Sequence, residues 1–575
     1  MKKLAIVGIG PRGLSALENL FLEAFNQKLK TKFHVTLFET YNQLGAGRIW
    51  DTTQTEVNWL NISERGLKDL KGRKEVKINN IIIPSFPSYT EWLPSNEKYL
   101  KTTDPDIFPP RKKLGKYLEE RCSSIVEVLK NNNIITVVST TITNIETENN
   151  KLILSNLDNQ YYTFDEVLIT IGHQPTKFEK DVEEYKIESF NKNFLCFTEP
   201  YPLTRITGST INKEKNVAIR GFGLAMIDVV RALTIEKGGS FEIQNKDTFE
   251  STFKNSALVP NQILPYSLDG LPMAPKPINA IIDSQFEISS KQADYFESEI
   301  SKVAKGVKKV KDNSFLKHLI AELSFEIFVK LEYKFSSKEI TEYQLKNIIK
   351  KWLSNSKYKN DLILDTDFEL DYIINAFVQM ACGKKAISLD YCIGQVWRHC
   401  QPILYKAFSH PNVSEDIIAG VIELDEQLKR YSYGPPVESM QQLLALSRAK
   451  ILNLKFCNNP KITIEQNTLT FEKYNDKKEI HVIINSVLNP PKLLEVTSPI
   501  ILNLLRNDLI EPIHSKLGIH TKENGLIMNS DLKKEIPLAV LGRLSKGSVI
   551  GVDAILECFG VRIENWAKDV VKRLN

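Results

Sequence analysis

Residues 4–20 contain the residue types and spacing of a nucleotide-binding turn. Four apolar residues predict a short buried strand, and the pattern Gly8-x-Gly10-x-x-Gly13 follows at once. In such a pattern the first glycine permits a tight turn, the second lets backbone approach a pyrophosphate, and the third lets the next helix lie close to the strand. The stretch therefore predicts a site for the phosphates of a dinucleotide.

The elements that must position this turn are also visible in the sequence. Apolar residues recur at helical spacing after Gly13, which predicts a helix with one apolar face. Residues 33–38 predict a second strand that ends on Glu39, an acid placed to accept hydrogen bonds from both ribose hydroxyls of an adenosine. Strand, turn, helix, strand and acid together predict one βαβ nucleotide-binding unit.

A second glycine turn follows an apolar segment at residues 216–220. Gly221-x-Gly223 precedes a predicted apolar helix, but Met226 stands where the third glycine would be. The next predicted strand, residues 240–244, carries no clear acid at its end. These features indicate a nicotinamide nucleotide site or, alternatively, a plain strand–turn–helix without a ligand.

Other segments could line these turns. The glycine-bearing loop around Gly47, followed by Asn61, could direct backbone N–H groups at an anion or simply form a surface turn. Arg111 stands at the start of a predicted helix, where it could meet a phosphate or remain a solvated charge. Gly172 and His173 end an apolar strand, where glycine lets backbone pass close to a ligand.

One helical stretch in the second half of the chain is also rich in functional side chains. Residues 394–400 contain Trp397, Arg398 and His399 on a predicted helix. Such a stretch is either a packed tryptophan with a buried polar neighbour or a substrate contact.

Composition limits the class of protein. The chain has 575 residues, 42% of them hydrophobic and 25% charged, with a net charge of +5, which favours two or three globular domains and gives little support for nucleic-acid binding. No stretch approaches 18 uninterrupted apolar residues, so we expect no membrane span and a cytoplasmic location. The seven cysteines are scattered without a C-x-x-C pair, which argues against a disulfide framework, a zinc ribbon and a redox dithiol; they are Cys122, Cys196, Cys382, Cys392, Cys400, Cys457 and Cys558. We expect no metal site.

The order of predicted elements suggests how the chain is divided. We expect residues 1–180 to form the first part of one nucleotide domain, 210–280 a second nucleotide domain, 281–425 a helical insertion that covers a cleft, and 426–575 a return to α/β structure, with residues 176–215 as a linker. Residues 134–164 and 461–480 each predict small antiparallel strands before an apolar strand, which suggests a weak internal duplication. A strand ending on Gly542, with a helix expected at 549–558, returns the chain to the first domain.

Several of these motifs resemble those of a known group of proteins. They are the opening Val-Gly-Ile-Gly-Pro-Arg-Gly-Leu-Ser, the loop Gly45-Ala-Gly47, Pro-Arg-x-x-x-Gly-x-Tyr-Leu from Pro110, Thr170-Ile-Gly172-His173-x-Pro175, and Gly434-Pro-Pro. The sequence resembles the bacterial FAD/NAD(P)-binding proteins with an amino-terminal G-x-G-P-R-G fingerprint, which are two-dinucleotide flavoproteins related to flavin-dependent monooxygenases. Some members N-hydroxylate an amino acid, as in the aspartate N-monooxygenases that make nitrosuccinate. The resemblance covers residues 1–275 and 430–575.

The resemblance implies an α/β fold with a Rossmann-like three-layer FAD domain, an inserted NAD(P) domain and a helical insertion. It implies FAD at the first turn, with Asn61 and Arg111 near the flavin half. The expected cofactor-binding residues are Gly8, Gly10, Pro11, Arg12, Gly13, Glu39, Gly47, Asn61, Arg111, Gly172, His173, Gly221, Gly223 and Gly542. No residue is predicted to be catalytic, because the flavin carries the redox chemistry.

The expected reaction uses FAD, NAD(P)H and molecular oxygen. NAD(P)H would reduce FAD, and a peroxyflavin would transfer oxygen to a small substrate such as an amino-acid amine. A simple NAD(P)H-dependent flavin reductase or oxidase, and a flavin-binding sensor without enzymatic activity, remain alternatives. The sequence indicates no nucleic-acid or membrane partner, and it leaves the oligomeric state open.

Overall fold

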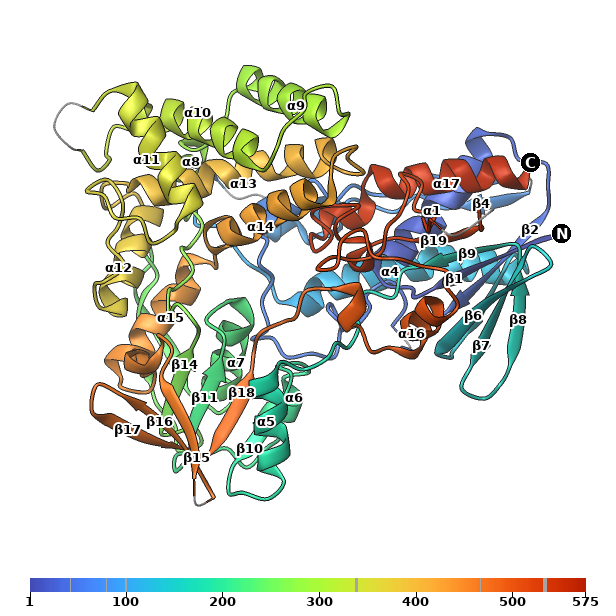
Figure 1. Ribbon diagram of the computed structural model, residues 1–575. Helices are drawn as coiled ribbons and strands as arrows, with labels where there is room; N and C mark the ends of the chain where they lie inside the picture. The colour runs from blue at the N-terminus through green and yellow to red at the C-terminus, as the bar shows by residue number, and fades with distance from the viewer. Residues whose placement is uncertain (42, 79, 99–100, 337–339, 466, 531–534) are drawn as a thin grey trace.

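The computed structural model describes residues 1–575 except 42, 79, 99–100, 337–339, 466 and 531–534. Figure 1 shows two groups of strands, one near the two termini and one at the opposite lower side, with a layer of helices above the second group. None of the described helices is both long and apolar enough to cross a lipid bilayer.

The first sheet is fully parallel and contains the first predicted βαβ unit. Its strand order is β19 (Leu538–Val540), β9 (Glu166–Ile169), β1 (Lys2–Val7), β2 (Phe33–Phe38) and β5 (Ile135–Val138). Strands β1 and β9 are central and buried on both faces, which explains why they appear as continuous apolar runs in the sequence. The predicted strand at residues 33–38 is therefore confirmed.

Different elements cover the two faces of this sheet. Leu4 and Ile6 of β1 pack against a cluster that includes α1 (Pro11–Asn26), α4 (Arg111–Asn131) and α17 (Val561–Leu574). Ala5 and Val7 point to the other face, where a meander of β6 (Ile142–Glu148), β7 (Lys151–Asn156) and β8 (Tyr161–Phe164) lies with α16 (Pro499–Arg506). The result is a three-layer unit. The prediction that residues 134–139 belong to the meander is wrong, because β5 extends the parallel sheet beside β2.

The second sheet repeats this plan. Its order is β10 (Leu195–Phe197), β18 (Val482–Asn485), β11 (Asn216–Arg220) and β14 (Gln262–Tyr266), all parallel, with α7 (Leu224–Thr234) after β11. A meander of β15 (Lys461–Glu465), β16 (Thr468–Lys473) and β17 (Asp476–Ile480) precedes β18, as the first meander precedes β9. Beyond β14, residues 452–458 form isolated parallel bridges in the place that β5 occupies in the first sheet. The arrangement agrees with the suggested duplication and with the predicted α/β fold with two dinucleotide-binding units.

Two sequence-based assignments in this region, the linker and a loop, are wrong, and one predicted strand is confirmed but lies outside the second sheet. The expected linker at residues 176–215 contains α5 (Lys180–Ser189), α6 (Thr204–Thr207) and β10, which forms one edge of the second sheet. The strand expected at 240–244 is β12 (Ser240–Asn245), which pairs only with β13 (Glu250–Lys254) in a separate hairpin. The prolines of residues 260–277 predict a loop, but this segment contains β14, the strand that continues the sheet.

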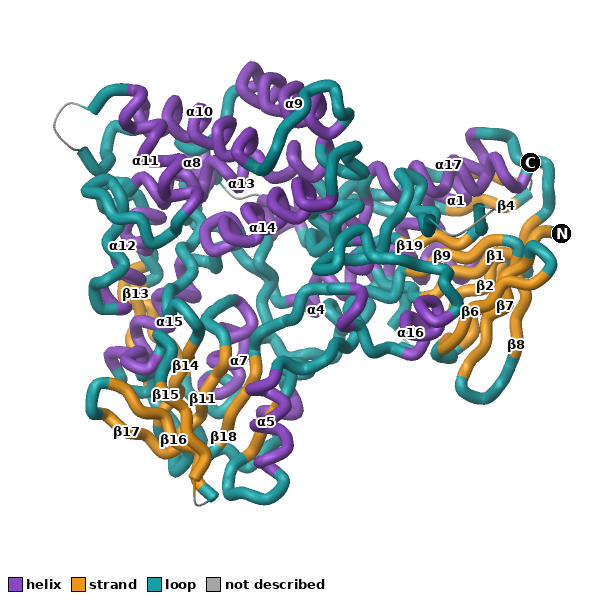
Figure 2. The backbone as a smooth tube through the Cα atoms, in the orientation of Figure 1, coloured by secondary structure: helices purple, strands orange, loops and turns teal. Residues whose placement is uncertain are grey.

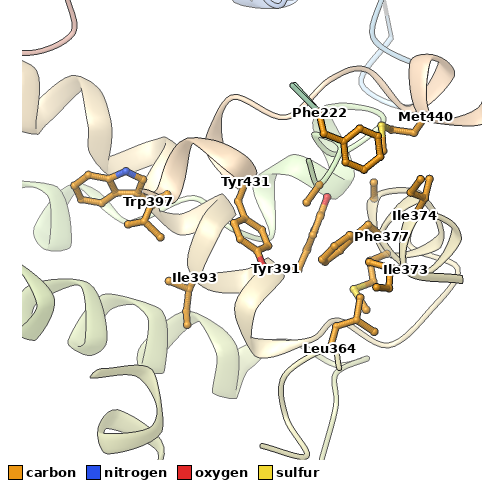
Figure 3. Close-up of a cluster of buried hydrophobic side chains, with 14 of the residues drawn as sticks. Phe222, Leu364, Ile373, Ile374, Phe377, Tyr391, Ile393, Trp397, Tyr431 and Met440 are labelled. Atoms are coloured by element: carbon orange, nitrogen blue, oxygen red, sulfur yellow. The ribbon is translucent and has the colours of Figure 1, made fainter. Parts of the chain in front are cut away.

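The helical module lies between β14 and residue 452. It consists of α8 (Ala280–Ser284), α9 (Ser290–Ala304), α10 (Ser314–Lys330), α11 (Glu342–Ser354), α12 (Leu370–Ala381), α13 (Leu389–Ala407), α14 (Glu415–Ser432) and α15 (Val437–Arg448). Figure 2 shows that helices dominate this part of the molecule. Figure 3 shows Phe222, next to Gly221 of the second turn, in the same buried cluster as Phe377 and Tyr431 of the module. The second sheet and the helical module therefore share one core.

The carboxyl-terminal segment returns to the first sheet, as predicted. Strand β19 pairs with β9, and α17 packs on α1. The prediction of a helix at residues 549–558 is wrong. Gly547 and Gly551 adopt positive φ angles of 115° and 76°, and helix α17 begins only at Val561. The remaining short elements are α2 (Glu64–Leu67), β3 (Val76–Ile78), β4 (Ile81–Ile83), α3 (Tyr89–Trp92) and the 3₁₀ turns at Ser95–Glu97, Leu454–Phe456, Leu493–Glu495, Arg543–Ser545 and Leu556–Phe559.

A buried charge network attaches α1 to α4, and its central carboxylate can be tested. Glu18 of α1 accepts hydrogen bonds from Arg73 at 2.9 Å and from Arg121 of α4 at 2.9 and 2.8 Å, and all three side chains are buried. We expect Glu18→Gln to lower the free energy of unfolding by about 3 kcal/mol or more, since two buried guanidinium groups lose their counter-charge. Urea unfolding followed by tryptophan fluorescence measures this loss. Glu127→Gln, at an exposed position of α4, is the control and should change little; an equal effect of both variants would contradict the assignment.

Candidate nucleotide-binding sites

The first glycine turn brings strand and helix closer together than any larger residue would allow. Gly8 has a φ of +94°, and a Cβ there would lie 2.8 Å from the carbonyl oxygen of Thr170 on the neighbouring strand. A Cβ on Gly13 would lie 2.3 Å from the carbonyl oxygen of Gly8. Both distances are below van der Waals contact, so both positions require glycine. Their predicted roles as turn and packing glycines agree with this geometry.

The middle glycine has a different environment, because it borders open space. A Cβ on Gly10 would meet only the Cα of Gly47, at 3.9 Å. Gly10 is the N-cap of α1, no side chain caps this helix, and Pro11 begins it. The backbone N–H groups of the first turn thus point into the space beside Gly10 and Gly47, where an anion would complement them and the helix dipole. The shape and charge of the turn fit a pyrophosphate.

Glu39 lies at the end of β2, beside the same turn. Its carboxylate accepts hydrogen bonds from the backbone N–H of Ile9 at 2.7 Å and of Thr40 at 2.9 Å. Burial raises the pKa of Glu39, and these hydrogen bonds and the charge of Arg48 oppose the rise. Oε1 also accepts from the backbone N–H of Tyr41 at 3.2 Å, so the further acceptor site that a ribose hydroxyl could use is on Oε2, which Ile9 binds.

The carboxyl ends of the other strands meet the turn at the same edge of the sheet. Arg12 of α1 donates to the carbonyl oxygen of Val552 at 2.6 Å, and its Cδ would lie 2.9 Å from a Cβ on Gly542. A Cβ on Gly172 would meet nothing within 4 Å, so this backbone also borders open space. The structure thus brings the predicted residues of β1, β9 and β19 together at one edge.

His173, which follows Gly172, is exposed at this edge but surrounded by cationic groups. Desolvation by the surrounding atoms and the charge of Arg543 lower the pKa of His173 to about 4. The imidazole is therefore neutral at pH 7 and can donate or accept a hydrogen bond without adding charge to the site.

Asn61 and Arg111 lie away from the turn, where the two nucleotide units meet. Asn61 donates to the carbonyl oxygen of Tyr433 at 2.8 Å. Arg111 donates to the carboxylate of Asp228 on α7 at 2.7 Å and to the carbonyl oxygen of Trp59 at 3.1 Å. The guanidinium of Arg111 is thus already paired with a carboxylate of the second unit, and its expected contact with a cofactor stays a prediction.

The second glycine turn has the same plan as the first. Gly221 has a φ of +106°, and its Cβ would lie 2.7 Å from Oγ of Ser486 on the neighbouring segment. Gly223 is the N-cap of α7 without a side-chain cap, and a Cβ there would meet only Sδ of Met273, at 3.9 Å. Met226 is buried in the core shared with the helical module, so it does not fill the turn. The N-terminus of α7 is therefore open to an anion.

The acid that marks the first turn has no counterpart in the second. Val7 pairs with Phe38 just before Gly8 and Glu39, and Arg220 pairs with Tyr266 just before Gly221 and Ser267. In this register Ser267 takes the place of Glu39. The sequence could not show this correspondence, because the strand after the turn was assigned to residues 240–244.

Sequence reasoning also missed the side chains that join the two units. The hydroxyl of Tyr201 donates to Asp228 at 2.5 Å, beside Arg111, and Arg231 of α7 lies 3.7 Å from the ring centre of Trp59. These residues come from distant segments and carry no local motif. Only the topology brings them together.

Part of the chain matches a known family. Residues 5–174 match the family model described as FAD-NAD(P)-binding. This segment contains the first glycine turn, Glu39 and the strand that ends at Gly172. The match confirms the predicted class of this unit and its predicted cofactors, FAD and NAD(P)H.

Two relatives and one solved structure show the distance to known proteins. Nitrosuccinic acid synthase npaA of Aspergillus oryzae is 26% identical over 243 residues, which cover 41% of this chain and 36% of the synthase. The uncharacterized protein YdhS of Escherichia coli is 24% identical over 301 residues, which cover 49% of this chain and 50% of that protein. The matches thus span at most half the length of either relative. A cyclohexanone-bound cyclohexanone monooxygenase is 10% identical, with a TM-score of 0.43 over 99% of this chain and 87% of the monooxygenase.

The open position at the first turn gives a direct test of FAD binding. We expect Gly10→Asp to weaken the affinity for FAD at least tenfold, about 1.4 kcal/mol, because it places a carboxylate where the pyrophosphate would lie. Equilibrium titration of the FAD-free protein with FAD, followed by flavin fluorescence, measures the affinity. Gly10→Ala is the matched control: with a φ of −77° and no atom nearer than 3.9 Å, alanine fits without strain. Equal FAD affinity of Gly10→Asp and wild type would rule out this site.

Proposed function

We propose that this chain is an FAD-dependent, NAD(P)H-consuming oxidoreductase, and more specifically a monooxygenase that transfers oxygen to the amine of a small substrate such as an amino acid. The coarser part of this proposal is supported by the FAD-NAD(P)-binding match over residues 5–174. It is also supported by a second glycine turn at the carboxyl edge of a second parallel sheet. The amine is suggested by the name of one distant relative, the nitrosuccinic acid synthase.

The observation that carries the proposal is the buried connection between the two units. Asp228 belongs to the helix that begins at Gly223, and Arg111 belongs to the first turn of α4 in the first unit. Tyr201 completes the contact by donating to the same carboxylate. Hydride transfer requires two reacting atoms at a fixed distance and angle. A buried ion pair between the two nucleotide units supplies that constraint.

The residues of each turn have distinct roles in this proposal. Gly8, Gly10 and Gly13, with Glu39 and the N-terminus of α1, would hold the ADP half of FAD. Gly221 and Gly223, with the N-terminus of α7, would hold the pyrophosphate of NAD(P)H. Bound FAD would supply the redox chemistry and, once reduced, react with oxygen.

The other parts of the chain would control access and charge. His173, neutral at pH 7, stands beside the open edge at Gly172 and can hydrogen-bond a ligand there. The helical module packs against the second unit through a shared apolar core and would exclude water from the space between the cofactors.

A two-step mixing experiment tests the proposal. Without oxygen, one sample of the FAD-loaded protein is mixed with NADPH and a second sample with NADH. The flavin absorbance at about 450 nm records the reduction of the flavin in each sample. We expect at least one of the two nucleotides to bleach the flavin. A flavin that stays oxidised with both would favour a flavin-binding protein without enzymatic activity. Oxygen is then admitted with an amino acid present. An N-oxygenated product, found by mass spectrometry, is expected; reoxidation that yields only hydrogen peroxide for every amine would identify a reductase or oxidase instead.

The second turn can be tested separately from the first. We expect Gly223→Asp to raise the KM for NADPH at least tenfold while the affinity for FAD is unchanged, because the added carboxylate faces only the nucleotide at the N-terminus of α7. Gly223→Ala is the control, since its Cβ would have 3.9 Å of clearance. Flavin reduction kinetics at varied NADPH measure the effect. A variant with wild-type kinetics would remove Gly223 from the proposed site.

A further inference from the structure

A cluster of positive side chains lies outside both glycine turns, where three parts of the chain meet. Arg65 comes from the first nucleotide unit, Lys276 from the segment after β14, and Arg398 and His399 from helix α13. The backbone joins the same parts, because the N–H of Asp106 donates to the carbonyl oxygen of Ile278 at 2.7 Å. The cluster thus occupies the junction of the first unit, the second unit and the helical module.

The two carboxylates of the cluster are paired with its positive groups. Asp106 accepts two hydrogen bonds from Arg65, at 2.9 and 2.7 Å. Asp283 accepts from Arg65 at 3.0 Å, from Arg398, and from Nε2 of His399 at 3.2 Å. Burial would raise the pKa of Asp283, but the hydrogen bond from His399 and the charge of Arg398 outweigh it and hold this pKa well below its usual range. Asp283 is therefore ionised, and both carboxylates act as acceptors for the positive groups around them.

The positive groups outnumber these two carboxylates. Arg65, Arg398 and Lys276 carry three positive charges when protonated, and His399 can add a fourth. Lys276 has no carboxylate partner among the residues that the structure describes: its Nζ donates to the backbone and side-chain oxygens of Asn61 and lies 5.8 Å from the ring centre of Phe108. Lys276 is therefore the cation of the cluster that no carboxylate contacts directly among the described residues.

Donors also remain free in the described structure. Nη1 of Arg398 and the third N–H of Lys276 have no partner among the described residues; Nδ1 of His399 has none either, and it can donate only in the protonated imidazole, because Nε2 donates to Asp283. The side chains of Arg65, Arg398 and His399 keep 30%, 19% and 18% of their surface exposed, so a solute can reach the cluster. Burial and the like charge of Arg398 lower the pKa of Lys276 to about 7, although the nearby charges of Asp106 and Asp283 oppose the shift.

We propose that Lys276, Arg398 and His399 form the binding site for a carboxylate of the substrate. This inference rests on the proposed function, since it identifies the substrate class as a small amine that also carries a carboxylate. A carboxylate would accept from the free donors, neutralise the excess charge and keep Lys276 protonated. Asn61, which binds Lys276 and was expected near the flavin half, would link this site to the cofactor.

Anion binding tests the site without turnover. The FAD-loaded protein is titrated with malonate, a compact dicarboxylate, and with malonamide, its neutral analogue, by calorimetry. We expect malonate to bind and malonamide not to bind. Lys276→Met and Arg398→Gln should each weaken malonate at least about tenfold, because each removes a charge-assisted hydrogen bond.

A matched variant on the same helix distinguishes a local loss of binding from a general change in surface charge. Lys406→Met removes an exposed lysine of α13, 68% exposed, and should bind malonate like wild type. Flavin absorbance and thermal unfolding establish that each variant is folded, and the two site variants serve as independent checks on each other. No malonate binding, or equal binding by both site variants and wild type, would overturn the inference.

Two further arms identify the ligand and keep this inference apart from the proposed function. If saturating NADP⁺ displaces malonate, or if inorganic phosphate binds more tightly than malonate, the cluster binds a nucleotide phosphate. Either result would overturn the proposed binding site for a substrate carboxylate. If NADPH does not reduce the flavin, only the proposed function fails. The carboxylate site is still tested in that case, because the binding of malonate through Lys276 can be measured without turnover.

Discussion

The arrangement of this molecule depends on the buried contact between Arg111 and Asp228. Each nucleotide unit has its own glycine turn, and each turn lies at the carboxyl edge of its own sheet. Neither edge alone could bring two cofactors into contact. The ion pair, with Tyr201 on the same carboxylate, fixes the helix that begins at Gly223 against the helix that begins at Arg111. Because Asp228 is buried and Arg111 and Tyr201 are half-buried, solvent screens their interaction only partly, and loss of Arg111 would leave the buried carboxylate without its counter-charge.

The first unit could be predicted from the sequence because its signals are local. Gly8, Gly10 and Gly13 follow one buried strand and precede one amphipathic helix, and the structure places all of them as expected. The second unit was assigned less well, and Pro265 explains why. A proline cannot donate to a strand ladder, so β14 looked like a loop. In the structure the missing N–H faces residues 452–458, and only isolated bridges form on that side, while the other side pairs continuously with β11.

The remaining errors involve features that only tertiary structure decides. Strand β10, Leu-Cys-Phe, has only three residues, too few to show a strand period in the sequence, and β18 pairs with it over all three. The pairing of Arg111 with Asp228, and of Arg398 with Asp283, joins residues far apart in the chain. The sequence drew attention to Arg398 and His399 but left a packing role and a substrate contact equally open. The position of Lys276 was not foreseen, since it depends on the path of the chain after β14.

The shared core also bears on the expectation that the helical module covers a cleft, because it decides whether the module can move separately from the second unit. Phe222 beside the second turn packs in the same cluster as the helices of the module, so the module and the second unit behave as one body. Opening the module alone would expose a large apolar surface, which costs about 25 cal/mol for each Å². Its contacts with the first unit are mixed: the same apolar cluster reaches Ile513, Leu517 and Ile550 of the carboxyl-terminal segment, while Asn61 with Tyr433 and Arg65 with Asp283 are polar. Polar contacts lose less when water replaces them. Any motion that admits a substrate is therefore expected locally, at the polar contacts of the junction where the positive cluster lies, while Arg111 and Asp228 keep the two nucleotide units together.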